Sequence, residues 1–253
     1  MRGLNLDNKI LVYTMGKVVS TSIRSSLNKL GRETMNAHTL NPDINNAIEK
    51  GFSRESKYVE QPLLDHHKYV YKYIKDNPEI KWKIISLVRD PVARNISTFF
   101  QVIDRLLPTY KNEPLITLKK SFMKGIDHEK VLNWQDFELK ELTGIDVYSV
   151  PFDKKKGYQT YKLGNFEVLL IKYEKLNECV SNAMREFLDI EHFKLDYSNF
   201  SENKEYSKDY TFFKEMAKLG NTYLNKSYQS KYIKHFYTDV EIEQFRKRWH
   251  YEN

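Results

Sequence analysis

Three short apolar runs along the chain predict buried β-strands, and each leads into a segment with helical periodicity. The runs are residues 9–14 (KILVYT), 83–88 (KIISLV) and 168–171 (VLLI). After the first run, apolar residues recur from Val19 to Leu30 at spacings of four, four and three, which gives a helix one buried face. Gly31 is expected to end this helix, because glycine readily adopts the left-handed conformation found at helix C-termini.

The second run is followed by Asp90 and Pro91, which favour the start of another helix as its cap and first residue. A fourth strand is expected within residues 33–40, and the segment 172–176 (KYEKL) leads from the third run into a further helix. Strands separated by helices predict an α/β fold with a central parallel β-sheet flanked by helices. In such sheets, ligands bind at the carboxyl ends of the strands.

The chain of 253 residues fits a single domain. Residues 108–164 are polar, lysine-rich and weakly periodic, with a turn expected at 154–157, and we interpret them as an elaboration of that domain. The C-terminal part is rich in tyrosine and is expected to be helical from Tyr210 onward.

Charge and cysteine content narrow the functional classes. The net charge of +7 and the pI near 9.1 indicate an anionic ligand or partner without identifying it. Cys179 is the single cysteine, so no internal disulfide can form and a reducing, cytoplasmic location is expected. We find no export signal and no apolar run long enough for a membrane span, which leaves only peripheral membrane association open.

The segment 16–22 (GKVVSTS) joins the first strand to its helix and has the composition of an anion site. Gly16, Lys17 and the hydroxyl residues Ser20, Thr21 and Ser22 stand where backbone amides and the helix dipole favour a phosphate. A Walker A loop would need glycine and serine or threonine where the chain has Leu11 and Val18, which disfavours a nucleoside triphosphate. The alternative is an ordinary solvated helix start.

A second candidate anion site is the segment 89–97 (RDPVARNIS), which follows the second strand. Arg89 lies at the tip of the strand and Ser97 two turns into the next helix, an arrangement that suits a phosphate monoester. The alternative is that Arg89 and Arg94 form structural ion pairs with Asp90 or Asp104.

Together the two segments resemble the 5′-phosphosulfate loop and the 3′-phosphate signature of sulfotransferases that use 3′-phosphoadenosine 5′-phosphosulfate (PAPS). Residues 168–176 (VLLIKYEKL) resemble a further strand and motif of these enzymes, with Lys172 in place of the usual arginine. Residues 203–207 (NKEYS) resemble the NKWYS signature of bacterial sulfotransferase-like proteins of capsular polysaccharide synthesis, with Glu205 in place of the tryptophan.

The resemblance implies a P-loop-type sulfotransferase fold and a role for each matched residue. Lys17 would contact the 5′-phosphate and the bridging oxygen of the departing sulfuryl group. Ser20, Thr21 and Ser22 would hold the 5′-phosphate with backbone amides, and Gly16 would bind the cofactor in the same loop. Arg89 and Ser97 would hold the 3′-phosphate. Lys204 and Tyr206 would close over the nucleotide.

Sulfuryl transfer to a hydroxyl needs a base, and histidine titrates in the required range. His67 stands 22 residues before Arg89, which is similar to the position of the base in carbohydrate sulfotransferases of the heparan 2-O type. We therefore predict His67 as the base, with His66 as the close alternative and His38 as a third candidate.

The remaining patterns favour neither a metal site nor nucleic-acid binding. No pair of histidines has metal-ligand spacing, and the alternation of tyrosine and lysine from Tyr69 to Lys75 is typical of an amphipathic element. The sequence therefore predicts a sulfotransferase that transfers a sulfuryl group from PAPS to a carbohydrate hydroxyl, with Trp134, Tyr148 and Phe152 as candidates for sugar stacking. A P-loop kinase-like phosphotransferase and a non-catalytic anion- or polysaccharide-binding protein remain the alternatives.

Overall fold

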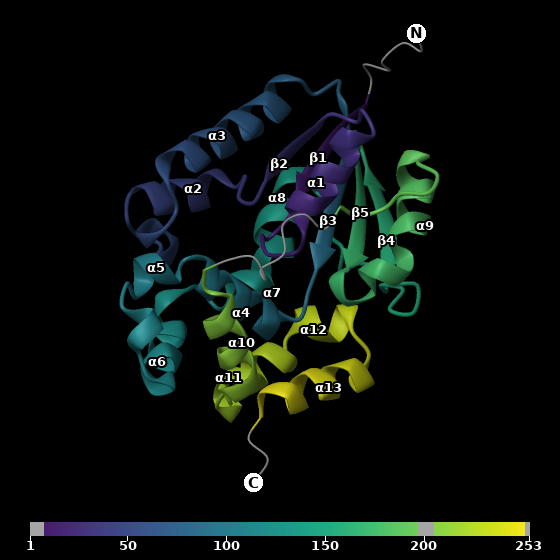
Figure 1. Cartoon of the computed structure of the whole chain (residues 1–253). Coiled ribbons are helices and arrows are strands. Elements are labelled where there is room, and N and C mark those ends of the chain that lie inside the picture. Colours follow the sequence, from purple (N-terminus) through teal and green to yellow (C-terminus); the bar gives the residue numbers. More distant parts are fainter. Residues whose placement is uncertain (1–7, 197–204, 251–253) are drawn as a thin grey trace.

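The computed structural model describes residues 8–196 and 205–250 (Figure 1). Within this part of the chain, five strands form one sheet in the order β2-β1-β3-β5-β4. Their bounds are β1 (Asn8–Tyr13), β2 (Thr34–Ala37), β3 (Lys81–Val88), β4 (Tyr158–Leu163) and β5 (Phe166–Lys172).

The strands β2, β1, β3 and β5 are parallel to one another, and the edge strand β4 is antiparallel to β5. The strands β1, β3 and β5 are buried along most of their length, because the inner strands of a parallel sheet are covered on both faces. These are the three apolar runs, so the predicted α/β class is confirmed, with a central sheet that is parallel except at β4.

The strand β4 was not predicted, and its antiparallel direction departs from the purely parallel sheet expected. It forms a hairpin with β5 across Gly164 and Asn165, and Gly164 has the positive φ of 58° that such a tight turn requires. The turn expected at 154–157 is observed at residues 154–156, before this strand.

Helices flank the sheet and close its carboxyl end. In Figure 1, α1 and α3 lie beside β1 and β2, α9 lies beside β4 and β5, and α10 to α13 gather below the carboxyl end of β3. The helices are α1 (Ser20–Lys29), α2 (Pro42–Glu49), α3 (Gln61–Asp76), α4 (Pro91–Gln101), α5 (Ile103–Leu106), α6 (Leu115–Gly125), α7 (Lys130–Trp134), α8 (Glu141–Thr143), α9 (Leu176–Leu188), α10 (Ser207–Met216), α11 (Asn221–Tyr228), α12 (Lys231–Phe236) and α13 (Asp239–Trp249). The other helical segments are the 3₁₀ turns η1 (Arg54–Lys57), η2 (Tyr110–Asn112) and η4 (Tyr173–Lys175) and the π-helix η3 (Gln135–Lys140).

The helix boundaries next to the two predicted anion segments follow the sequence signals. Gly31 adopts a φ of 71° after α1, and the amide of Arg32 donates to the carbonyl of Leu27, which closes the helix as a Schellman motif. Asp90 caps α4 by accepting a hydrogen bond from the amide of Val92 at 3.0 Å. Both predicted boundaries are confirmed.

Candidate functional site

The loop between β1 and α1, residues 14–19, makes a sharp left-handed turn after the carboxyl end of β1, and we refer to it as the anion loop. Gly16, Lys17 and Val19 have φ values of 76°, 60° and 56°, a region that non-glycine residues rarely adopt. Val19 precedes α1 and offers no side chain to cap it, so the first amides of the helix keep no side-chain partner from the cap residue. An anion is the kind of ligand that such a helix start binds.

The hydroxyl residues predicted for this loop lie at the start of α1 in different environments. Ser20 is half-buried, Thr21 is exposed and Ser22 is buried. Val18 stands where a Walker A loop has its serine or threonine, and it is fully buried in the core. A hydroxyl at this position would therefore not face a ligand. The side chains of Ser20 and Thr21 remain accessible to a ligand at the loop.

Two arginines from the segment after β3 hold this loop in place. The guanidinium of Arg94 donates to the carbonyl of Met15 at 2.5 Å, and that of Arg89 donates to the carbonyl of Lys17 at 2.6 Å. Arg94 is only 4% exposed. The alternative ion pairs of these arginines with Asp90 or Asp104 do not occur among the described residues, where both side chains donate to backbone carbonyls of the loop.

Arg89 is itself fixed by aromatic residues. Its guanidinium lies 4.4 Å from the ring centroid of Tyr173. The hydroxyl of Tyr232 accepts a hydrogen bond from the Arg89 amide and donates one to the Arg89 carbonyl. The predicted partner Ser97 is buried on α4, and neither it nor Arg89 lines the cavities described below.

A small cavity of about 140 Å³ opens beside the loop, and we refer to it as the histidine cavity. It brings together the predicted residues Gly16, Lys17 and His67 with His38, which follows β2. Its other polar lining residues are Thr39, Glu55, Tyr58, Arg94, Thr98, Gln101 and Lys130. The lysine of the anion loop and two histidines therefore border one space.

His38 is oriented by the backbone of the loop. Its Nδ1 atom lies 2.9 Å from the carbonyl oxygen of Thr14, and because a carbonyl only accepts hydrogen bonds, Nδ1 must carry the proton of the neutral ring. The Nε2 atom then has a free lone pair for a proton. Burial lowers the pKa of His38 to about 4, so the ring is neutral at pH 7.

His67 is buried more deeply, at 2% exposure, and its Nε2 atom accepts the backbone N–H of His38 at 3.3 Å. Its Nδ1 atom, which carries the proton in this tautomer, makes no hydrogen bond within residues 8–196 and 205–250. Burial also lowers the pKa of this ring, to about 3. His66 does not line the histidine cavity, and its Nε2 lies 2.8 Å from the carbonyl of Asn36.

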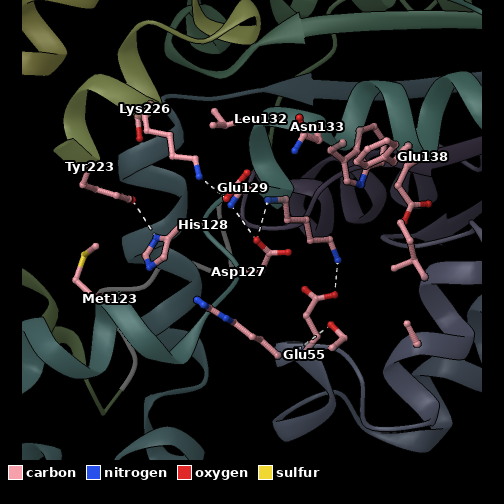
Figure 2. A pocket seen from close by; sticks show the side chains of 18 of the residues that line it. Glu55, Met123, Asp127, His128, Glu129, Leu132, Asn133, Glu138, Tyr223 and Lys226 are labelled. Carbon is pink, nitrogen blue, oxygen red and sulfur yellow. Dashed lines mark hydrogen bonds and ion pairs between the residues drawn. The ribbon is translucent and has the colours of Figure 1, made fainter.

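A larger cleft of about 860 Å³ shares Glu55 and Lys130 with the histidine cavity, and Figure 2 shows this cleft. Its walls come from α2, η1, α6, α7, η3 and α11, so residues of the predicted elaboration form much of it. The exposed side chains of Phe52, Met123 and Phe137 line it, together with several ion pairs and hydrogen-bonded polar groups. This mixture of apolar surface and polar groups is typical of a site for an organic ligand.

The aromatic residues predicted to stack on sugars are placed differently. Trp134 lines the large cleft but is 1% exposed, and its indole N–H donates to the carbonyl of His38. Tyr148 and Phe152 do not line the cleft and instead contact Phe236 of α12.

Of the residues expected to close over a nucleotide, Lys204 lies outside the described residues. Tyr206 is buried at 7% exposure, and its ring centroid lies 6.1 Å from that of Phe100. Glu205, which stands where the signature has tryptophan, is exposed and forms an ion pair with Lys111. Within the described chain, Tyr206 thus has a packing role.

Sequence reasoning missed Glu55, Arg94 and Lys130 as site residues. Arg94 was considered only for an ion pair, and the other two lie in segments with no recognisable motif. The three residues come from η1, α4 and α7, and only the packing of these elements brings them to the histidine cavity.

These features define an α/β protein with a lysine-containing anion loop, two neutral histidines and an adjoining ligand cleft. The profile of the NKWYS family, described as "putative capsular polysaccharide synthesis protein", matches residues 109–238, which is just over half of the chain. The chain belongs to this family. No curated protein and no solved structure matches it significantly. None of the helices in the described part is long and apolar enough to cross a membrane.

Proposed function

We propose that this protein is a sulfotransferase that moves a sulfuryl group from PAPS to a hydroxyl of a carbohydrate during synthesis of a capsular or other cell-surface polysaccharide. The observation that carries the proposal is the arrangement of the two spaces. The histidine cavity borders the anion loop, and the large cleft adjoins it across Glu55 and Lys130. A transferase needs such an arrangement, because donor and acceptor must meet at one point.

The anion loop suits the phosphosulfate end of the donor. PAPS supplies the sulfuryl group, so that an S–O bond to the bridging oxygen breaks and an S–O bond to the acceptor forms. Lys17 and the first amides of α1 would bind the 5′-phosphate and stabilise the negative charge left on it. Arg89, next to the same loop, would bind the 3′-phosphate with the donors that it does not use on Lys17.

His38 is the residue best oriented to act as the base. Its protonated Nδ1 is bonded to Thr14, which leaves Nε2 to accept the proton of an acceptor hydroxyl. A bound dianion would raise its low pKa, because a nearby negative charge favours the protonated ring. The lone pair of His67 is already used by the backbone N–H of His38, so His67 positions His38 in this proposal.

The large cleft is the proposed acceptor site. Its polar groups would donate hydrogen bonds to sugar hydroxyls and accept hydrogen bonds from them. The exposed rings of Phe52 and Phe137 offer apolar faces against which a sugar ring can pack. The family's link to capsular polysaccharide supports a carbohydrate in this position.

Calorimetric titration with adenosine 3′,5′-bisphosphate tests this function directly. The wild-type protein should bind it without added Mg²⁺ and should prefer it to ADP, because ADP lacks the 3′-phosphate. Lys17→Gln should weaken this binding, whereas Lys156→Gln, which removes a surface partner of Glu186, should not.

The alternatives give different results in the same experiment. Tighter, Mg²⁺-dependent binding of ATP would favour a kinase-like phosphotransferase. No binding of any nucleotide at millimolar concentration would overturn the proposal and would favour an anion- or polysaccharide-binding protein.

A further inference from the structure

Among the described residues, Glu55 and Lys130 alone line both the histidine cavity and the large cleft. Glu55 comes from η1 and Lys130 is the first residue of α7. Figure 2 shows Glu55 at the lower side of the cleft, with a dashed line joining its carboxylate to a lysine ammonium. The pair therefore marks the place where the two spaces meet.

The ammonium group of Lys130 is held in one position. It lies 2.7 Å from Oε2 of Glu55 and 3.1 Å from Oγ1 of Thr39. The side chains of Lys130 and Glu55 are only 13% and 10% exposed. A buried ion pair carries a desolvation cost, and its attraction is screened less than that of a surface pair.

The charge of Lys130 acts on the groups around it. Burial alone would raise the pKa of Glu55, but the charge and hydrogen bond of Lys130, together with the charge of Arg94 and a hydrogen bond with Tyr58, outweigh burial and lower it. Burial lowers the pKa of both His38 and His67, and the positive charge of Lys130 lowers each further. Lys130 is thus electrostatically coupled to the histidine that we propose as the base.

Two other cations of the large cleft, Arg54 and Lys226, are engaged away from this junction. Lys226 pairs with Glu129 on an exposed part of the wall, and Arg54 donates to the carbonyl of Ile126. Neither borders the histidine cavity. Lys17 borders that cavity from the side of the anion loop, so a group between donor and acceptor would have Lys17 on one side and Lys130 on the other.

We propose that Lys130 is a second cation of the transfer site, which binds the sulfonate oxygens as the sulfuryl group passes from donor to acceptor, and that Glu55 is the residue that positions it. This inference rests on the proposed function. In the transfer, the bridging oxygen keeps the electron pair of the broken S–O bond, the acceptor oxygen forms the new one, and the hydroxyl proton goes to Nε2 of His38. Lys130 takes no part in the proton transfer and supplies charge stabilisation to the sulfonate.

The test measures the affinity for inorganic sulfate, by calorimetry, in the presence of saturating adenosine 3′,5′-bisphosphate. The bisphosphate occupies the anion loop, so the sulfate reports the place of the transferred group. Lys130→Gln should weaken sulfate binding at least about tenfold, the effect expected for one lost charged hydrogen bond. Its affinity for the bisphosphate should remain within about twofold of the wild-type value, well below that tenfold criterion.

The controls separate charge, position and folding. Lys130→Arg should retain much of the sulfate affinity, and Glu55→Gln should weaken it because the Lys130 ammonium then loses the carboxylate that positions it. Lys156→Gln removes a Lys–Glu pair of 2.8 Å elsewhere on the surface and should have no effect. If Lys130→Gln does not fold, the double variant Lys130→Gln/Glu55→Gln leaves no unpaired buried charge and serves in its place.

The outcomes distinguish this inference from the proposed function. Wild-type sulfate affinity in Lys130→Gln, or no sulfate binding by the wild-type protein when it has bound the bisphosphate, would overturn the role of Lys130 and leave the sulfotransferase proposal standing. Failure of the wild-type protein to bind the bisphosphate would overturn both.

Discussion

The Nδ1 atom of His38 lies 2.9 Å from the carbonyl oxygen of Thr14, and this contact links the histidine to the backbone of the anion loop. Thr14 directly follows β1, and His38 directly follows β2. Because β1 and β2 are parallel neighbours, their carboxyl ends deliver the loop and the histidine to the same edge of the sheet. The register of the two strands therefore determines where the proposed base lies relative to Lys17.

Replacing His38 by glutamine should abolish transfer and leave nucleotide binding intact. Glutamine retains an amide N–H for the Thr14 carbonyl but cannot take up the acceptor proton. We expect the release of adenosine 3′,5′-bisphosphate from PAPS to fall by about 100-fold or more, the usual contribution of a general base. The calorimetric affinity for the bisphosphate should stay within about twofold, which separates a loss of chemistry from a loss of binding.

Two comparisons decide between the histidines. His66→Gln should keep its turnover, because His66 does not line the histidine cavity. His192→Gln, at an exposed position on the protein surface, serves as the neutral control. Normal turnover in His38→Gln, with turnover lost in His67→Gln, would return the base assignment to His67.

The conformation of the anion loop can be tested at Gly16. A Cβ atom at this position would lie 3.9 Å from the ring of His38, which is ordinary contact, so the cost of alanine comes from the positive φ of 76°. Gly16→Ala should lower the free energy of unfolding by about 1 kcal/mol and weaken bisphosphate binding about fivefold, the equivalent change in an equilibrium constant.

Gly31→Ala is the matched control for that variant. Gly31 has a similar φ of 71°, no atom within 4 Å of an added Cβ, and a position at the far end of α1. Gly31→Ala should lower the free energy of unfolding, measured by urea denaturation, about as much as Gly16→Ala does. It should leave the affinity for the bisphosphate unchanged. Equal losses of affinity in the two variants would show that the loop conformation has no specific role.

Local sequence signals predicted the strands and helix ends whose formation depends on residues close to them in the sequence. The inner strands are recognisable as apolar runs because both of their faces are buried. Asp90 marks the start of α4 and Gly31 the end of α1 through hydrogen bonds within a few residues of the chain. The strand β4 also had a signal, the Gly164–Asn165 pair typical of a hairpin turn, which the lysine-rich surroundings obscured.

No sequence signal marked Glu55 and Lys130, which line both the histidine cavity and the large cleft. Glu55 and Lys130 are 75 residues apart, and their contact depends on the packing of η1 against α7. Similarly, the bond from Arg94 to the Met15 carbonyl spans 79 residues, so the sequence shows the arginine but not its partner. Long-range side-chain partners follow from tertiary packing, which a single sequence does not display.

The two buried histidines should make the protein sensitive to acid. Their pKa values in the fold, about 4 for His38 and about 3 for His67, lie below the ordinary value of 6.5, so the unfolded chain binds more protons in this range. Their contribution to stability is complete above pH 6.5 and is lost as the pH falls toward these values. Glu174, whose pKa burial raises to about 6, works in the opposite direction as the pH falls below 6.

Urea denaturation at pH about 7.5 and about 5 isolates the histidine effect when wild type and His67→Gln are compared. The wild-type protein should lose more unfolding free energy between the two conditions than the variant, because glutamine cannot take up a proton on unfolding. Equal losses in both proteins would show that His67 is not buried in its neutral form.

The last prediction concerns Tyr232, whose hydroxyl satisfies both the amide and the carbonyl of Arg89 at 2.8 and 2.9 Å. Tyr232 is fully buried, so Tyr232→Phe leaves two backbone groups without a partner and should lower the free energy of unfolding by about 2 kcal/mol. Because Arg89 also donates to the Lys17 carbonyl, its displacement should weaken bisphosphate binding as well. Tyr69→Phe, at a position that is 59% exposed, should change stability by less than about 0.5 kcal/mol. Wild-type stability and affinity in Tyr232→Phe would mean that α12 does not support the anion loop through Arg89.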